Sequence, residues 1–269
     1  MTEVTYGPIT STLVAVRNRA VTDLSLHTQR PLLPRRLDPF SLTLNQRGAL
    51  FNLAINAWTE QDMTKIELCL QQAINGGRIS EEDRIFLKEK RGFAKLSRSA
   101  YQLFDETHRP PEKLRHFTKA VGKLIDNEDV PTEQWAKIVL DAVPICQQMP
   151  IYQLCTDQSY REFLNKYTHS IGKLLQKPFL TPKLFHKLRK KIGIFMDLYR
   201  LSATLFSTQE EIQTYLFLLQ LNRFLGNKHD DFLMQALKGQ IHYSREQILL
   251  SDEERLLIGQ FLNAVTTSS

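Results

Sequence analysis

The stretch "DRIFLKEKRGFAKLSRSAYQLF", residues 83–104, decides the fold class, because it places basic and apolar residues on opposite sides of one helix. Its basic residues are spaced by four, three, four and three positions; they are Arg84, Lys88, Arg91, Lys95 and Arg98. At about 100° per residue these positions fall within a stripe about 80° wide. Phe86, Phe93 and Phe104 lie on the other side. The pattern predicts a helix whose apolar side is buried and whose basic side stays open.

A solvated helix face is the plainer interpretation of this stripe, because Lys and Arg are the usual outer residues of helical bundles. The stripe contains no acidic residue, however. A solvated face usually mixes signs, so that ion pairs form between neighbouring turns. The all-positive row therefore favours an anionic partner.

Two further segments repeat the arrangement. In "LFHKLRKKIGIFMDLYRL", residues 184–201, Leu188 and Phe195 point away from a basic face. That face and the lysine before the segment supply Lys183, His186, Lys187, Arg189 and Lys190. In "PEKLRHFTKAVGKLID", residues 111–126, the basic side includes Lys119 and Lys123. All three segments predict amphipathic helices with cations gathered on one face.

The helical period continues through most of the chain, which has 269 residues with only eleven Gly and eleven Pro. Ser or Thr followed by acidic residues predicts helix starts near Thr59, Ser80, Thr132, Thr208 and Ser251. The predicted helices are 46–57, 60–75, 81–105, 111–127, 132–148, 151–176, 182–206, 209–225, 229–239 and 246–265. No segment predicts a strand, so we expect an all-α fold of packed helical bundles.

Residues 1–43 are expected to form an irregular arm, since "TQRPLLPRRLDPF" holds three prolines between Pro31 and Pro39. Residues 44–269 are expected to form the helical domain. The net charge of +6 is mild and permits a polyanionic partner. The three cysteines form no C-x-x-C pair, and no apolar run is long enough to span a bilayer. We expect a cytoplasmic protein without a metal or another cofactor and without a membrane partner.

The striped helices belong to a longer repeat. Lys88-x-x-Arg91 is followed by "VGKLID", residues 121–126, and His186-x-x-Arg189 is followed by "LGNKHD", residues 225–230. Both later segments have the form apolar-Gly-x-x-x-Asp. The order of the two motifs recurs about 100 residues further along, which predicts a duplicated helical hairpin. The first repeat spans about 80–130, and the second about 180–240.

These motifs resemble the CHAD family, the conserved-histidine α-helical domain. The resemblance implies two pseudo-symmetric antiparallel helical bundles that flank a basic cleft, and non-catalytic binding of inorganic polyphosphate in that cleft. The polyphosphate-binding residues would be Arg84, Lys88, Arg91, Lys95, Arg98, Lys119, Lys123, Lys183, His186, Lys187, Arg189 and Lys190. The chain departs from the family pattern where Lys88 replaces the first histidine and where Gly193 and Met196 replace basic residues. It would be a divergent member.

Three alternatives bear on the same residues. No motif of a known nucleic-acid-binding fold is present, so we expect no specific nucleic-acid recognition. His229, Asp230 and Asp231 are consecutive on a helix and diverge by about 100°, so they predict neither a metal site nor catalysis. An adaptor module, whose basic faces dock an acidic protein, remains the alternative function. A phosphate group beside His186 favours its charged form, so polyphosphate should bind more tightly at about pH 6 than at about pH 8.

Overall fold

The structure is a computed structural model that describes residues 11–16, 18, 38–76, 79–126, 132–147 and 152–266. These residues contain helices and two isolated β-bridges but no strand, so the all-α prediction is confirmed. The chain divides into two compact units. Unit 1 comprises Met1–Val14 and Leu44–Cys155, and unit 2 comprises Ala15–Thr43 and Thr156–Ser269. No helix among the described residues is long and apolar enough to cross a membrane.

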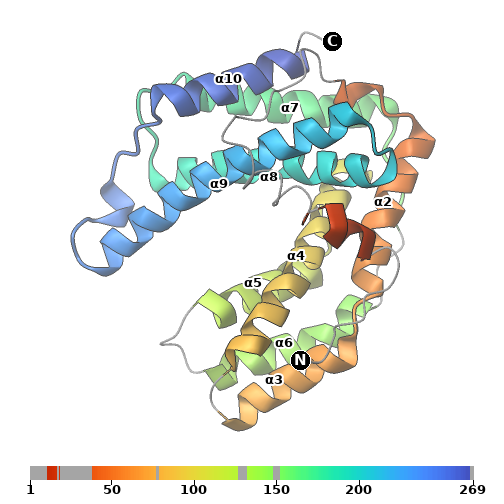
Figure 1. The fold of residues 1–269 in the computed structure, drawn as a ribbon, viewed down its shortest axis with the longest axis vertical. Coiled ribbons are helices and arrows are strands. Elements are labelled where there is room, and N and C mark those ends of the chain that lie inside the picture. The colour runs from red at the N-terminus through yellow and green to blue at the C-terminus, as the bar shows by residue number, and fades with distance from the viewer. Residues whose placement is uncertain are drawn as a thin grey trace. The chain divides into compact units, whose positions relative to one another are not determined.

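Between Leu44 and Cys155, the described part of unit 1 contains five helices (Figure 1). They are α2 (Leu44–Thr59), α3 (Met63–Gly76), α4 (Glu81–Phe104), α5 (Glu112–Asp126) and α6 (Thr132–Gln147). Helix α4 packs against α2 and α5, and α6 packs against α3 and α5. The buried ring of Trp58 on α2 meets Phe117 on α5 edge to face, with ring centroids 5.0 Å apart. Aromatic packing therefore joins helices that are distant in sequence.

Polar contacts fix the spacing within unit 1. The buried Ser97 hydroxyl on α4 donates to the Ala54 carbonyl of α2 at 2.9 Å, which brings the two helices close. The buried Arg47 guanidinium donates to the Cys155 carbonyl at 3.3 Å. A backbone bridge between Asp105 and Leu154 joins the end of α4 to the same segment. The start and the end of the segment Leu44–Cys155 are thereby joined to the core of unit 1.

Unit 2 contains four α-helices in its described part, together with short 3₁₀ turns. They are α7 (Asp157–Leu175), α8 (Pro182–Leu205), α9 (Gln209–Leu237) and α10 (Asp252–Thr266), with η1 (Pro39–Ser41) and η2 (Tyr243–Arg245). Helix α8 packs chiefly against α9, and α7 packs against α10. Phe195 of α8 meets Phe261 of α10 at 5.1 Å between ring centroids. The core of unit 2 lies among these four helices.

Several predicted helix starts are confirmed. The Ser80 hydroxyl accepts from the Asp83 amide at 3.0 Å, and Thr208 forms a reciprocal capping box with Glu211. Ser251 caps α10 in the same way, through the amide of Glu254. The start near Thr59 is displaced, because Thr59 ends α2 and Asp62 accepts from the Lys65 amide at the start of α3. Residues 11–16 are helical, whereas the predicted arm was irregular; its prolines from Pro31 to Pro34 lie outside the described residues.

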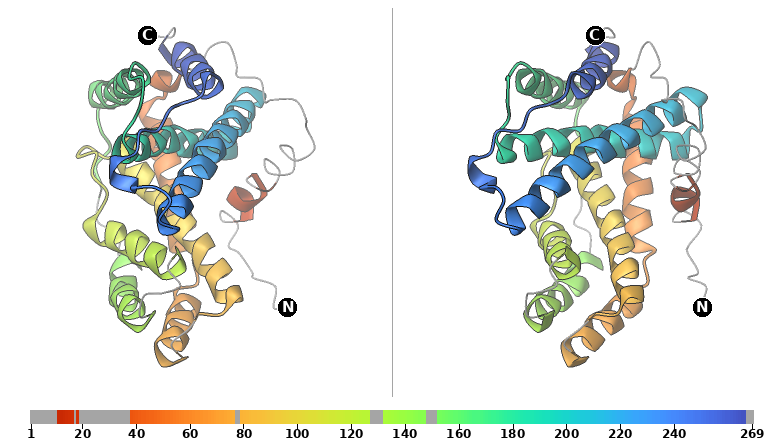
Figure 2. Two further views of the ribbon diagram at one scale, coloured as in Figure 1. Left: turned by 90° about the vertical axis from the view of Figure 1, so that its left-hand side faces the viewer. Right: turned by 60° about the vertical axis from the view of Figure 1, so that its left-hand side comes forward.

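The break at Gly226, which separates the helices predicted at 209–225 and 229–239, is wrong. Helix α9 runs through this glycine without interruption, as the turned views show (Figure 2). Gly226 is buried, and its missing side chain leaves room for a residue of α8. The glycine therefore serves packing between helices and does not form a turn.

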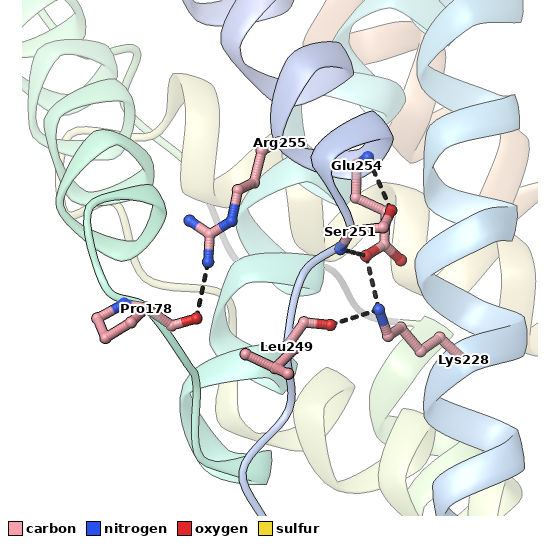
Figure 3. Close-up of polar contacts among 6 residues, drawn as sticks. All are labelled: Pro178, Lys228, Leu249, Ser251, Glu254 and Arg255. Carbon is pink, nitrogen blue, oxygen red and sulfur yellow. Dashed lines mark hydrogen bonds and ion pairs between the residues drawn. The ribbon is translucent and has the colours of Figure 1, made fainter.

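Charged side chains hold the start of α10 and the segment that precedes it (Figure 3). Lys228 of α9 donates to the Leu249 carbonyl and to the Glu254 carboxylate, both at 2.6 Å. The Arg255 guanidinium donates to the carbonyls of Lys177 and Pro178, each at 2.9 Å, and to that of Leu175. Arg255 thereby satisfies the carbonyl of the last residue of α7, Leu175, and two carbonyls of the segment that follows the helix.

Replacing Arg255 should destabilise unit 2. Because Arg255→Gln removes charge-assisted hydrogen bonds to several carbonyls, we expect the free energy of unfolding to fall by about 1–3 kcal/mol. Urea denaturation followed by circular dichroism measures this change. The matched control is Arg161→Gln on the exposed side of α7. Equal stability of the two variants would contradict the role given to Arg255.

Candidate functional site

The basic stripe of α4 divides into two kinds of position. Lys88 and Lys95 are exposed, whereas Arg84, Arg91 and Arg98 are half-buried. The three arginines are spaced by seven residues, so they lie along one line of the helix. The prediction that the whole basic side stays open is therefore wrong for these arginines.

The arginines of this line contact α5. Arg98 donates to the Thr118 hydroxyl at 2.7 Å, and Arg91 donates through Nε to the Thr118 carbonyl at 3.1 Å. Arg84 donates to the Ile125 carbonyl at 3.2 Å, near the end of α5. Residues late in α4 thus meet residues early in α5, which shows that the two helices are antiparallel. We call this line of contacts the α4–α5 seam.

A glycine makes room for Arg91 at the seam. A Cβ atom on Gly122 would lie 2.1 Å from Nη2 of Arg91 and 2.5 Å from its Cζ. Real Cβ atoms do not approach so closely, so any other residue at this position would displace the guanidinium. The Gly of the "VGKLID" segment therefore lies under the Arg of the K-x-x-R motif, and the two motifs of the first repeat meet in space.

The remaining predicted residues of unit 1 flank the seam. Lys119 is exposed and Lys123 half-buried on α5. For two antiparallel helices joined at this seam, helical geometry places Lys88, Lys95 and Lys119 on the same side of it. Arg115, one turn before Lys119, is exposed on that side too. This row of Lys88, Lys95, Arg115 and Lys119 is the unit 1 cation row.

Unit 2 contains a similar seam between α8 and α9. A Cβ atom on Gly226 would lie 3.3 Å from Nη2 of Arg189, so this arginine also lies against a glycine of the following helix. Nε of Arg189 is buried and makes no hydrogen bond within the described part of the chain. Burial lowers the pKa of the guanidinium, and Asp230 and Tyr243 oppose that shift. The second repeat thus also brings its Arg and its Gly together.

Three of the predicted cations of unit 2 are exposed lysines, Lys183, Lys187 and Lys190. By helical geometry Lys183 and Lys190 share one side of the α8–α9 seam with Arg223 of α9. Arg223 is exposed and was missed in the sequence. The internal repeat could have identified Arg223 as a candidate site residue. Lys119 stands three residues before the seam glycine Gly122, and Arg223 stands three residues before the seam glycine Gly226. Lys183, Lys190 and Arg223 form the unit 2 cation row.

His186 belongs to a cluster that the sequence did not reveal. Its ring lies 5.7 Å from that of His229, centroid to centroid, with the planes tilted by 33°. His229 contacts the Tyr243 hydroxyl through Nε2 at 3.0 Å and the Asp230 carboxylate through Nδ1 at 3.2 Å. His186 is exposed at one side and lies against the other members of the cluster with its other side. This partial burial, followed by Lys190, His229 and Arg189, lowers the pKa of His186 to about 4. His186 is therefore neutral at physiological pH.

Lys191 lies away from the seam. Its ammonium group sits 3.8 Å above the centre of the Tyr167 ring of α7. Burial lowers its pKa to about 8, and Lys187 and Lys166 contribute to the shift. Lys191 is thereby assigned to helix packing, and it does not extend the row.

Within the described residues no group of three or more His, Cys, Asp or Glu side chains is placed to hold a metal ion. Comparison of the chain with family models, curated proteins and solved structures gives no match. The geometry of the two seams is therefore the basis for any functional assignment.

Substituting the seam glycine tests the geometry of unit 1. Gly193→Ala on α8 meets nothing within 4 Å, so it should stabilise the protein, by about 0.5–1 kcal/mol. Gly122→Ala brings the same gain in helix propensity, but its added methyl group displaces the Arg91 guanidinium. We expect it to be less stable than Gly193→Ala by at least about 1 kcal/mol, as measured by denaturation. Equal stabilisation by both substitutions would show that Arg91 does not need the space above Gly122.

Proposed function

We propose that the protein binds inorganic polyphosphate, or a similar polyanion, along the cation rows beside its two helical seams, and that it does so without catalysis. The observation that carries the proposal is the separation of two kinds of basic residue. The arginines Arg84, Arg91 and Arg98 are used to join helices. The lysines beside them, Lys88, Lys95 and Lys119, are exposed to solvent.

Four of the exposed lysines are not neutralised by neighbouring acids among the described residues. Lys88 and Lys119 in unit 1, and Lys183 and Lys187 in unit 2, form no ion pair with an acidic side chain within the ranges the structure describes. Like charges that stay unpaired on a surface repel one another mildly. A chain of phosphates would relieve that repulsion and release counterions.

The spacing of the lysines suits a linear anion. Lys88 and Lys95 are two helical turns apart, which is about 10 Å along the helix axis. Lysine acts as a compact point charge on a flexible stem, so it adapts to successive phosphates without fixed geometry. The rows therefore favour a flexible polyanion over a ligand of fixed shape.

The CHAD resemblance adds the finer part of this proposal. In both hairpins an arginine of the first helix lies against a glycine of the second, and a cation stands three residues before that glycine. This recurrence supports a duplication across residues 80–130 and 180–240. Pseudo-symmetric bundles that flank a basic cleft, and membership in that family, remain proposals.

A second function has one observation in its favour. The end of α9 exposes Leu233, Met234 and Leu237, of which Leu237 is 81% exposed. An adaptor that docks an acidic protein through its basic faces would use such an apolar edge for additional contact. Polyphosphate is the better-supported ligand, because this apolar edge lies at the end of α9, beyond the one residue of α9 that belongs to a cation row, Arg223.

Removing exposed cations should weaken polyphosphate binding without unfolding the protein. We expect Lys88→Gln/Lys95→Gln/Lys119→Gln to lower the affinity for long-chain polyphosphate at least about tenfold, since each lost contact removes a released counterion. Fluorescence titration at two salt concentrations measures both the affinity and its salt dependence. The salt dependence should be shallower in the variant than in the original protein.

A charge-matched control separates this site from general attraction. Lys137→Gln/Lys173→Gln/Lys238→Gln removes three exposed lysines outside the rows. Its affinity should stay within about twofold of the original protein. Equal losses in the two triple variants would mean that net charge alone attracts the polyanion, and the proposed rows would be discarded.

A further inference from the structure

The His186 cluster differs from the corresponding position in unit 1. Lys88 and His186 stand three residues before the seam arginines Arg91 and Arg189, so they are equivalent in the repeat. Lys88 is exposed, and lysine is a residue type that does not titrate in the physiological range. His186 is neutral there in the absence of an anion, and a bound phosphate group favours its charged form. The two units therefore respond differently to pH.

The groups around His186 set the conditions for its protonation. On α8 they are Lys190 and Arg189, on α9 they are His229 and Asp230, and on η2 the hydroxyl of Tyr243 closes the cluster. The cations outnumber the single exposed carboxylate of Asp230. A proton on His186 is disfavoured in the absence of an anion, which agrees with its lowered pKa of about 4.

His229 is held in one tautomer. A carboxylate only accepts hydrogen bonds, so the contact at 3.2 Å with Asp230 assigns a proton to Nδ1 of His229. Nε2 of the neutral ring then accepts from the Tyr243 hydroxyl at 3.0 Å. If Nε2 is protonated, the hydroxyl must turn and become the acceptor. The imidazole pair can therefore take up a proton without moving the helices.

We propose that His186, His229, Arg189 and Tyr243 form a proton-linked phosphate site, in which a bound phosphate group and a proton on the imidazole pair stabilise each other. This inference rests on the proposed function. It assigns pH-dependent binding to unit 2 alone, while the unit 1 cation row binds independently of pH. As the pH falls, binding would then strengthen at unit 2, whereas binding at the unit 1 cation row would not change.

The sign of the pH effect follows from linkage. An anion beside the imidazoles raises the pKa of His186 above its value of about 4 without ligand. Affinity then increases as the pH falls through the raised pKa, and it levels off below about 4. Each linked proton changes the affinity by up to about tenfold per pH unit within that window.

Calorimetry with tripolyphosphate tests the inference. Titrations at about pH 6, in two buffers of different ionisation enthalpy, give the number of protons taken up on binding. We expect up to about one proton for the original protein. His186→Lys should abolish the uptake and leave binding equally tight at about pH 6 and about pH 8, as expected for a lysine. His229→Gln should reduce the uptake.

Two controls separate the possible failures. His116→Gln removes a histidine from the exposed side of α5, and the proton uptake should not change. Lys88→Gln/Lys95→Gln/Lys119→Gln should lower the affinity and leave the uptake unchanged. If tripolyphosphate binds without proton uptake, or if His186→Lys keeps the uptake, the proton-linked site is rejected while polyanion binding stands. If no binding occurs between about pH 5 and about pH 8, the proposed function itself is rejected.

Discussion

The contact between an arginine and a glycine across a helical seam is the constraint on which the rest of each hairpin depends. In α4–α5, Arg91 occupies the space above Gly122, and its Nε reaches the Thr118 carbonyl at 3.1 Å. In α8–α9, Arg189 lies against Gly226. A guanidinium can lie this close to a helix backbone only where a side chain is missing. The seam thereby fixes which faces of the two helices meet, and the outward direction of the neighbouring lysines follows from helical geometry.

The seam also explains how a chain with a modest net charge can present concentrated positive surface. The half-buried arginines of α4 donate hydrogen bonds to two carbonyls and one hydroxyl of the adjacent helix. These acceptors are uncharged, so they do not neutralise the guanidinium groups. The exposed lysines add to that fixed positive field. A polyanion would thus meet a surface prepared before binding, and arginine would contribute to attraction without having to reorient.

The sequence predicted the helical class and the local signals well, because caps and periodicity depend on neighbouring residues. The caps at Ser80 and Thr208 show this. Prediction from the sequence failed where the role of a residue depends on a contact with a residue far away in the chain. Gly226 was taken as a helix break because its role depends on Arg189, 37 positions earlier (226 − 189). The contact of His229 with Tyr243 likewise depends on the course of the chain after α9. Arg223 was missed although the repeat contained its signal, three residues before the glycine.

The most direct test of the central claim is the melting temperature of the protein with and without polyphosphate of defined length. A ligand that binds only the folded state raises the melting temperature. The increase grows with the logarithm of the ratio of the ligand concentration to the dissociation constant, once that ratio exceeds one. Polyglutamate and single-stranded RNA, matched in charge, serve as comparisons for an acidic protein partner and for nucleic acid. The account predicts the largest increase with polyphosphate. No increase with polyphosphate, or a larger one with polyglutamate, would contradict it.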